Sequence, residues 1–359
     1  MLVVTGLTAG GAERVVVNLA DYFAIKGHAV TLVFMTDKEK IFFLPKNEKI
    51  DIVDLDITKN PVSFLLGLRK LARLIKEKKV DIVHSHMFHA NILACVARIF
   101  TPMNRLICSS HNTNEGGALR MLMYRLTDSI PDLRTNVSQE AVDIFIEKKA
   151  TKKGNMIPII NGIDTDYFKF CQTARNRVRK DLKLADENKL IVAAGRLTEA
   201  KGFSILLHAF KAILAINKNV RLAIAGIGPL ENELKSLVME LQIEEHVSFL
   251  GVYNEMPALM SATDIFVLSS LWEGFGLVVA EAMACERVVV ATDSGGVKEV
   301  LGDCGFLVSQ SETDLLATGI EQALNLDEAE KSELGKRARS RIISNFSLEK
   351  NAEAYFNLY

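Results

Sequence analysis

Short apolar runs alternate with amphipathic helical patterns along the whole chain of 359 residues, and this alternation constrains the fold most strongly. Runs such as 2–5, 189–195 and 264–270 have the length of strands and are rich in Val, Ile and Leu, as the buried strands of parallel sheets are. The pattern predicts an α/β protein with helices on both faces of its parallel sheets. The other expected strands are 29–35, 81–86, 105–110, 155–160, 220–226, 247–251 and 287–293.

The alternation starts again near residue 189, after the polar, Arg- and Lys-rich segment 174–189. A chain of this length exceeds the size at which single hydrophobic cores stop growing. We therefore expect two Rossmann-like, doubly wound domains that face each other across a cleft. In such sheets, ligands bind beyond the carboxyl ends of the strands.

Charge and cysteine content exclude several classes of protein. Residues 1–160 hold 22 Lys and Arg against 16 Asp and Glu, and residues 161–359 hold 21 against 28, a balance that disfavours nucleic acid as a partner. Five widely spaced cysteines without a C-x-x-C motif indicate a reducing compartment and no thiolate zinc site. No apolar stretch is long enough to span a membrane, and the N-terminus lacks a basic leader. We expect a cytoplasmic protein, peripheral at the inner face of the cell membrane at most.

The segment LWEGFGLVVAEAMAC, residues 271–285, combines two glycines and two carboxylates with a buried helical pattern. Gly274 and Gly276 leave backbone amides accessible, and Leu277 starts the helix. Burial of Glu273 and Glu281 without partners would cost several kcal/mol. Carboxylates accept hydrogen bonds from hydroxyl groups, so the pair predicts a polyhydroxylated ligand. The alternative is a helix N-terminal Glu favoured by the dipole, with the second Glu exposed.

Two further loops follow expected strands and lead into helices. In AAGRLTEAKGF, Arg196 and Lys201 lie five residues apart and can hold two phosphates, Arg as a fork and Lys as a point charge. In TAGGAER, Gly10 and Gly11 allow a close approach to an anion at a helix N-terminus. The TAGGAER segment is also compatible with an ordinary tight turn, and it lacks the G-x-G-x-x-G fingerprint of dinucleotide-binding proteins.

Histidine and aspartate clusters favour no metal site. His84, His86 and His89 lie close in the sequence, but no carboxylate or cysteine is nearby and we expect the strand to send its side chains to opposite faces. The DLD and DTD pairs (Asp54 and Asp56, Asp164 and Asp166) are interpreted as surface turns. His111 follows strand 105–110 at the functional edge, where it is either a ligand-facing residue or a capping one.

The segment 65–79 has the pattern of an amphipathic helix. Leu68, Leu71 and Ile75 form the expected buried stripe, and the basic side chains gather on another face. That face, formed by Arg69, Arg73 and Lys76, is either solvated or a candidate contact for a membrane or acceptor with anionic headgroups.

The order R-x4-K followed by E-x7-E, together with several other segments, resembles the family 4 glycosyltransferases of the GT-B fold. The chain is similar to bacterial O-antigen, capsule and exopolysaccharide glycosyltransferases. The resemblance implies retaining transfer of a hexose or N-acetylhexosamine from a nucleotide sugar, with no metal or other cofactor. The matching segments are GGAERVVVNLA, DIVHSH, SSHN, IINGID, AAGRLTEAKGF and LWEGFGLVVAEAMAC.

The resemblance also implies domain limits. An acceptor-binding domain would span 1–165 and a nucleotide-sugar-binding domain 166–340, closing about the 161–188 region. The C-terminal segment 341–359 would cross back to the first domain. The expected acceptor is a saccharide or a prenyl-diphosphate-linked saccharide.

Residue roles follow from the resemblance position by position. Arg196 and Lys201 would hold the donor diphosphate, and Glu273 and His111 would contact the transferred sugar. Glu281 would bind the ribose. The remaining contacts would come from Gly10, Gly11, Val252 and the segment Gly274, Phe275, Gly276 and Leu277.

Other functions remain compatible with these residues. They are a nucleotide-sugar epimerase or hydrolase of the same fold, a soluble sugar-phosphate transferase, and a mannosyltransferase that uses GDP-mannose. A NAD-dependent oxidoreductase is disfavoured by the missing glycine fingerprint. A catalytically silent binding module is disfavoured because the chain contains all five expected charged or imidazole residues. They are His111, Arg196, Lys201, Glu273 and Glu281.

Overall fold

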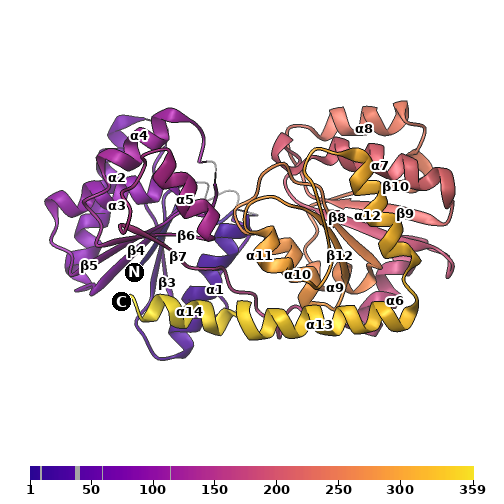
Figure 1. Cartoon of the computed structure of the whole chain (residues 1–359). Coiled ribbons are helices and arrows are strands. Elements are labelled where there is room, and N and C mark those ends of the chain that lie inside the picture. Colours follow the sequence, from indigo (N-terminus) through magenta and orange to yellow (C-terminus); the bar gives the residue numbers. More distant parts are fainter. Residues whose placement is uncertain (9, 37–40, 59, 114) are drawn as a thin grey trace. The chain divides into compact units, whose positions relative to one another are not determined.

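The structure is a computed structural model that describes residues 1–8, 10–36, 41–58, 60–113 and 115–359. The chain forms two compact units (Figure 1). Unit 1 comprises Met1–Gly162 and Leu348–Tyr359, and unit 2 comprises Ile163–Ser347. Each unit contains one parallel sheet with helices packed against it.

The sheet of unit 1 has seven strands in the order β3-β2-β1-β4-β5-β6-β7. Val4 pairs in register with Phe34 on one side and with His86 on the other, so the strand order reverses around β1. The strands are β1 (Leu2–Val4), β2 (Thr31–Phe34), β3 (Asp51–Asp54), β4 (Ile82–His86), β5 (Arg105–Ser109), β6 (Leu133–Asn136) and β7 (Met156–Pro158). The helices are α1 (Gly11–Ile25), α2 (Pro61–Glu77), α3 (Phe88–Phe100), α4 (Ala118–Leu126), α5 (Gln139–Glu147) and α14 (Leu348–Phe356).

The sheet of unit 2 has six strands in the order β10-β9-β8-β11-β12-β13, so its order reverses around β8. The strands are β8 (Lys189–Ala194), β9 (Val220–Ala225), β10 (Val247–Gly251), β11 (Ile265–Leu268), β12 (Val288–Thr292) and β13 (Phe306–Val308). The helices are α6 (Gln172–Asp181), α7 (Phe203–Ile216), α8 (Glu231–Glu240), α9 (Met256–Ala262), α10 (Leu277–Ala284), α11 (Val297–Leu301), α12 (Thr313–Asn325) and α13 (Glu328–Phe346), with short 3-10 turns η2 (Glu199–Lys201) and η3 (Glu244–His246).

Local sequence explains where the principal helices begin. Asn60 caps α2, because its side-chain oxygen accepts the N–H of Ser63 at 2.8 Å and proline at the first helical position needs no partner for an N–H. Asp327 and Glu330 form a reciprocal capping box at the start of α13. Helix α2 confirms the expected amphipathic pattern, with Leu68, Leu71 and Ile75 among its buried residues.

Three strands were missing from the sequence prediction: β3, β6 and β13. Strand β3 begins and ends with aspartate, and its first two residues are exposed, so it lacks the apolar run of a central strand. Asp54 is therefore the last residue of a strand, which corrects its assignment to a turn. The DTD pair does form a turn, in which Asp164 accepts the N–H of Tyr167 at 2.9 Å.

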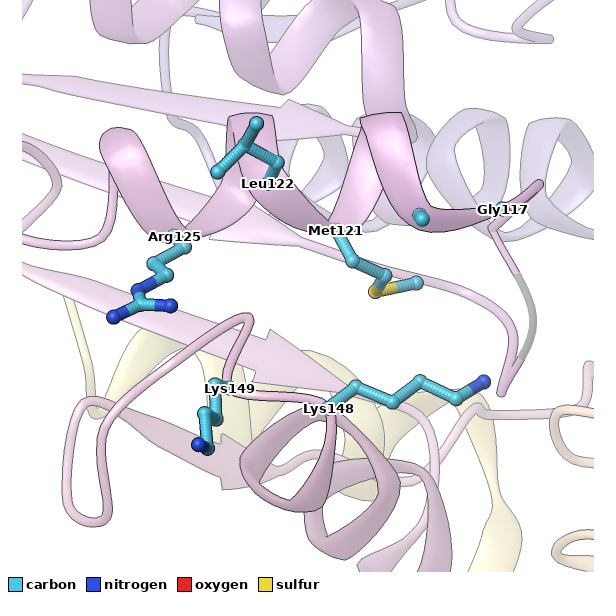
Figure 2. A pocket seen from close by; sticks show the side chains of 7 residues that line it. Gly117, Met121, Leu122, Arg125, Lys148 and Lys149 are labelled. Atoms are coloured by element: carbon cyan, nitrogen blue, oxygen red, sulfur yellow. The ribbon is translucent and has the colours of Figure 1, made fainter.

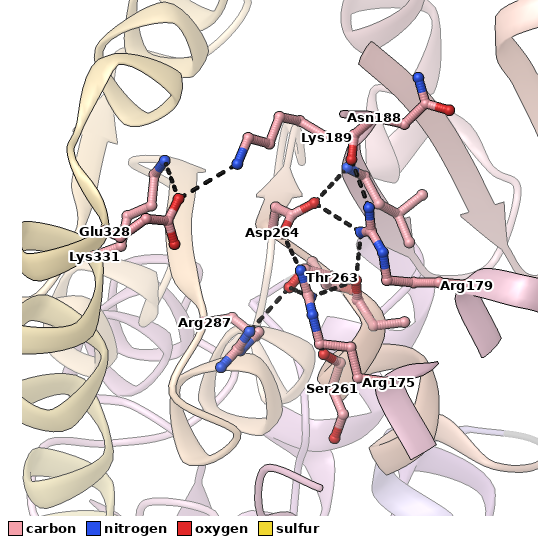
Figure 3. Close-up of polar contacts among 12 residues, drawn as sticks. Arg175, Arg179, Asn188, Lys189, Ser261, Thr263, Asp264, Arg287, Glu328 and Lys331 are labelled. Atoms are coloured by element: carbon pink, nitrogen blue, oxygen red, sulfur yellow. Dashed lines mark hydrogen bonds and ion pairs between the residues drawn. The ribbon is translucent and has the colours of Figure 1, made fainter. Parts of the chain in front are cut away.

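The polar segment 174–189 was expected to lie in a hinge, but much of it is helical. Helix α6 packs on α9 within unit 2, and Arg175 and Arg179 both bind Asp264, at 2.6 and 3.0 Å (Figure 3). Arg175 also donates to the carbonyl of Ala262 at 2.8 Å. The basic residues of this segment therefore anchor a helix to the core of unit 2 rather than sit on a mobile connection.

The C-terminal segment contributes to both units. Residues 341–346 complete α13 in unit 2, and α14 belongs to unit 1. Within unit 1, the hydroxyl of Tyr359 lies 2.8 Å from Nδ1 of His84, and the amide of Asn351 donates to the carbonyl of Ile160 at 2.5 Å. Tyr355 is fully buried. Helix α14 is therefore part of the packing of unit 1.

Candidate functional site

The loops at the carboxyl edge of the unit 2 sheet bring together the predicted cation and carboxylate. Lys201 ends the turn η2 after β8, and Glu273 lies in the loop after the neighbouring strand β11. Their side chains form an ion pair, and both are largely buried. Ser270 donates from its hydroxyl to Oε1 of Glu273 at 2.9 Å, which fixes the carboxylate in place. Ser270 was not predicted, because an isolated serine carries no motif.

Close backbone contacts hold these loops together. Gly202 has φ +57°, and a Cβ there would lie 2.1 Å from the carbonyl oxygen of Ser269. Gly295, after β12, has φ +56°, and a Cβ there would lie 2.0 Å from the carbonyl oxygen of Glu273. A side chain at either glycine would push apart the loops that hold Lys201 and Glu273.

Helix α10 starts directly after this loop. Gly276 is its N-cap and has the left-handed conformation, with φ +84°. The first amides of the helix therefore have no intrahelical acceptor and can bind an anion or hydroxyl. The ring of Phe275 packs on Phe346, with centroids 5.8 Å apart, so only its backbone can contact a ligand. Glu281 is buried within the helix at 5% exposure, as the sequence predicted for this segment.

The other predicted residues of unit 2 lie on loops at the same edge. Arg196 follows β8 and is exposed, while its neighbour Leu197 is held by backbone hydrogen bonds to the loop after β9. Val252 follows β10 and is 41% exposed. The strands of all these loops are consecutive in the sheet, so one edge of unit 2 carries the whole predicted donor set of this unit.

In unit 1, Gly10 and Gly11 lie at the N-terminus of α1, with Gly10 as the N-cap. A Cβ at Gly10 would lie 2.2 Å from Oε2 of Glu13. Glu13 is 7% exposed and accepts a hydrogen bond from Thr8 at 2.9 Å. A side chain at residue 10 would therefore displace the buried carboxylate of Glu13, a contact that the sequence did not reveal.

His111 belongs to a row of histidines at the ends of β4 and β5. The rings of His84 and His86 stack with centroids 3.9 Å apart, so the expectation that they point to opposite faces was wrong. Residues two apart on a strand share a face. Nδ1 of His86 lies 3.1 Å from Nε2 of His111. His89 lies on α3 instead, and no group of three metal-ligating side chains occurs in the part of the chain that the structure describes.

The environment of this row keeps the imidazoles neutral. Burial lowers the pKa of His111 to about 4 and the pKa of His86 well below its ordinary value. Glu115 was not predicted, although its Oε1 accepts the N–H of His111 at 3.4 Å. Burial raises the pKa of Glu115 to about 7, so a carboxyl group that is only partly ionised at neutral pH lies beside an uncharged imidazole.

Unit 1 also carries two basic surfaces. Arg69, Arg73 and Lys76 are exposed along α2, on the face that the sequence predicted, and continue a stripe that starts with the exposed Val62 and Leu66. A second surface is a pocket of about 400 Å³ along α4 and the end of α5, with an apolar wall and no acidic residue in its lining (Figure 2). Its lining residues are Gly117, Ala118, Met121, Leu122, Arg125, Lys148 and Lys149. No helix among the described residues is long and apolar enough to cross a membrane.

The chain has the two parallel-sheet, Rossmann-like units of the GT-B fold, and it is a glycosyltransferase. The model described as Glycosyltransferase Family 4 matches residues 9–167. The model described as Glycosyl transferases group 1 matches residues 174–341. Together the two models cover most of both units, which confirms the family expected from the sequence.

Similarity to individual proteins extends over nearly the whole chain. The N-acetylgalactosamine-N,N'-diacetylbacillosaminyl-diphospho-undecaprenol 4-alpha-N-acetylgalactosaminyltransferase of Campylobacter jejuni is 27% identical, over 97% of this chain and 96% of that protein. The N-acetyl-alpha-D-glucosaminyl L-malate synthase of Bacillus anthracis is 26% identical, over 98% and 94%. A crystal structure of HepE from Anabaena in complex with UDP and glucose superposes with a TM-score of 0.84 at 21% identity, covering 99% of this chain and 98% of that one.

Proposed function

We propose that this chain transfers a hexose or N-acetylhexosamine from a UDP-sugar to a lipid-linked saccharide during cell-surface polysaccharide synthesis in the cytoplasm, with retention of configuration. The observation that carries the proposal is the pair of Lys201 and Glu273 beside the N-terminus of α10. The pair offers a cation for phosphate and a carboxylate for sugar hydroxyls side by side. The similarity to a structure that contains UDP and glucose supports this donor class.

Charge development during transfer explains the roles of these residues. Cleavage of the anomeric C–O bond leaves negative charge on the departing diphosphate and positive charge on the sugar. Arg196 and Lys201 stabilise the diphosphate, in the role that a divalent ion would otherwise have. Glu273 binds hydroxyls of the sugar, and Glu281 binds those of the ribose. Contacts to the nucleobase and phosphates come from the backbone at Val252 and at the start of α10.

Retention is proposed to occur by attack on the same face. A double displacement requires a carboxylate next to the anomeric carbon, and Glu273 is already held by Lys201 and Ser270. The acceptor hydroxyl forms the new C–O bond on the face from which the diphosphate departs. Its proton passes to the departing phosphate oxygen, so UDP is released and no residue of the chain gains or loses a proton overall.

The acceptor is proposed to bind unit 1 through a prenyl diphosphate group. The curated relative from Campylobacter jejuni has a diphospho-undecaprenol substrate by name. The basic stripe of α2 supports the same chemistry, because exposed Arg and Lys beside exposed apolar residues suit an anionic headgroup with a hydrocarbon chain. The pocket along α4 offers a second surface of the same character.

The test measures release of nucleoside diphosphate from a panel of UDP- and GDP-sugars in the presence of excess EDTA. Each donor is incubated with and without prenyl-diphosphate GlcNAc or GalNAc. One UDP-sugar with acceptor-stimulated release is the expected result. In the variant Lys201→Ala, release should fall at least about 100-fold, since a preorganised charge contributes that much to phosphate departure. The matched control is Lys211→Ala, an exposed lysine on α7.

Other outcomes would contradict parts of the proposal. Equal release with and without acceptor would indicate a hydrolase of the same fold, and release from GDP-mannose alone would indicate a mannosyltransferase. A combined Arg69→Gln, Arg73→Gln, Lys76→Gln variant should raise the KM for the lipid-linked acceptor without changing hydrolysis of the donor. If only Arg125→Gln, Lys148→Gln, Lys149→Gln does so, the acceptor binds at the α4 pocket instead.

A further inference from the structure

His86 holds the ring of His111 through a direct bond between two imidazoles. Nδ1 of His86 lies 3.1 Å from Nε2 of His111, and the rings are inclined by 32°. The outer nitrogens of the two rings, Nε2 of His86 and Nδ1 of His111, are both buried. Neither has a hydrogen-bond partner among the described residues. The two rings therefore share one bond and leave one buried nitrogen open at each end.

A hydrogen bond between two neutral imidazoles contains a single proton, so the tautomers of the two rings depend on each other. If His86 donates from Nδ1, then Nδ1 of His111 carries its own proton and is a donor. If His111 donates from Nε2, then its Nδ1 is an acceptor and Nε2 of His86 is a donor. Burial keeps both rings in the neutral range near pH 7, because it lowers the pKa of each.

We propose that His86 is a positioning residue for His111: it fixes the orientation of the His111 ring and, through the shared proton, decides whether Nδ1 of His111 donates or accepts toward a ligand. A hydroxyl group can do either, so a sugar hydroxyl that meets Nδ1 of His111 must take the role that complements the tautomer set by His86. Recognition at His111 therefore depends on the proton that it shares with His86. His86 lies outside the sequence motif SSHN.

The surroundings of His86 prevent its ring from turning away. His84 stacks on it with centroids 3.9 Å apart. Both nitrogens of His84 are already engaged, Nε2 at 2.7 Å from Ser109 and Nδ1 at 2.8 Å from Tyr359. On the other side, the main-chain N–H of His111 donates to Glu115. The ring of His86 is therefore covered by that of His84, and the main chain at His111 is held by Glu115.

The proposal rests on the proposed function only where it names a sugar hydroxyl as the ligand. The bond between the rings is testable without any activity. In the full chain with 15N-labelled histidine at pH 7, NMR should detect one coupling across a hydrogen bond between two ring nitrogens. The 15N chemical shifts should show a single tautomer at His111, because protonated and unprotonated ring nitrogens have clearly different 15N chemical shifts. Absence of this coupling in the unaltered protein would overturn the proposal.

Two variants and one control complete the spectroscopic test. His86→Phe keeps a stacked ring but removes the bond, so His111 should change to a mixture of tautomers. In His86→Asn, the coupling between ring nitrogens must vanish, but the amide can still bond to His111 and should preserve one tautomer. His208→Gln, at an exposed histidine of α7, should leave every signal of His111 unchanged. A His111 tautomer that is the same in His86→Phe as in the unaltered protein would also overturn the proposal.

Turnover provides the second readout. We expect His86→Phe to lower kcat at least about 10-fold, as the loss of a partner that orients a functional histidine does at other sites, with a smaller change in KM. His86→Asn should recover part of this loss. Equal loss in both variants, or a loss confined to KM, would assign His86 to packing alone. Absence of transferase activity in the unaltered protein would contradict the proposed function and leave the NMR result to decide this inference.

Discussion

At the scale of single residues, the candidate site depends on groups that are buried and yet polar. Glu273 has a cation and a hydroxyl as partners, and the imidazole of His111 has a second imidazole. Such groups are expensive to bury unless each is paired or neutral. Both solutions occur in this molecule: pairing around Glu273 in unit 2 and neutrality around His111 in unit 1.

The raised pKa of Glu115 leads to a prediction on stability. Its pKa is raised from 4.5 to about 7 by burial, so its contribution to stability is complete below pH 4.5 and is lost as the pH rises through 7. Glu115→Gln should therefore increase the free energy of unfolding by about 1–3 kcal/mol at pH 8 and change it little at pH 4.5. Urea denaturation at both pH values measures this, with the exposed Glu147→Gln as control. An equal effect of Glu115→Gln at both pH values would contradict the prediction.

The pairing of Lys201 with Glu273 shows what the sequence could not reveal at this scale. The motifs R-x4-K and E-x7-E identified the four charged candidate residues of unit 2, because each motif is local in sequence. The two members of the ion pair are 72 residues apart, and only the order of the strands makes their loops neighbours. The histidine row was not predicted for a simpler reason. We expected the histidines of the strand to point to opposite faces, although residues two apart on a strand share a face.

At the scale of elements, the predictable parts were the strands with continuous Val and Ile. All the expected strands are present in the sheets, because a buried parallel strand needs apolar side chains on both faces. Strands β3 and β13 lie at the edges of their sheets and are partly exposed; β3 begins and ends with aspartate, and β13 has only three residues, so neither carries a long apolar run. Helix α6 was not predicted because nearly all its residues are polar and Val178 is its only buried residue.

The anchoring of α6 leads to a prediction on Asp264. Burial alone would raise the pKa of this carboxyl group, but Arg175, the N–H of Leu190 and Arg179 together lower it below its ordinary value. Asp264→Asn should lower the free energy of unfolding by about 2–4 kcal/mol at pH 7, because two largely buried guanidinium groups lose their charge partner. Chemical denaturation followed by circular dichroism measures the change.

The effect of Asp264→Asn should also depend on pH in a defined direction. A carboxyl group with a lowered pKa in the folded state stabilises the protein above its ordinary pKa and loses this contribution as the pH falls below it. The difference between the variant and the unaltered protein should therefore shrink below about pH 4. Asp303→Asn, which breaks an exposed pair with Arg337, should cause little change. A comparable loss in both variants would show that the network around α6 contributes nothing beyond a surface ion pair.

At the scale of the whole molecule, the chain passes between the units at two points, Gly162–Ile163 and Ser347–Leu348. The second point lies between two consecutive helices, where the sequence predicts one segment, 341–359. Helix α13 packs on α10 in unit 2, and α14 packs on α1 in unit 1. The last residues of the chain therefore complete the core of the unit that contains its first residues.

Truncation after Ser347 tests this dependence. Removal of α14 exposes the space filled by the buried Tyr355 and deprives His84 of its partner Tyr359. Loss of one buried aromatic side chain alone costs about 3–5 kcal/mol, so unit 1 should unfold at a clearly lower temperature while unit 2 keeps its transition. Differential scanning calorimetry separates the two transitions, and Asp264→Asn identifies that of unit 2. Tyr359→Phe, which removes only the hydroxyl, should shift the unit 1 transition by much less. A truncated chain whose two transitions both stay in place would show that α14 is dispensable for unit 1.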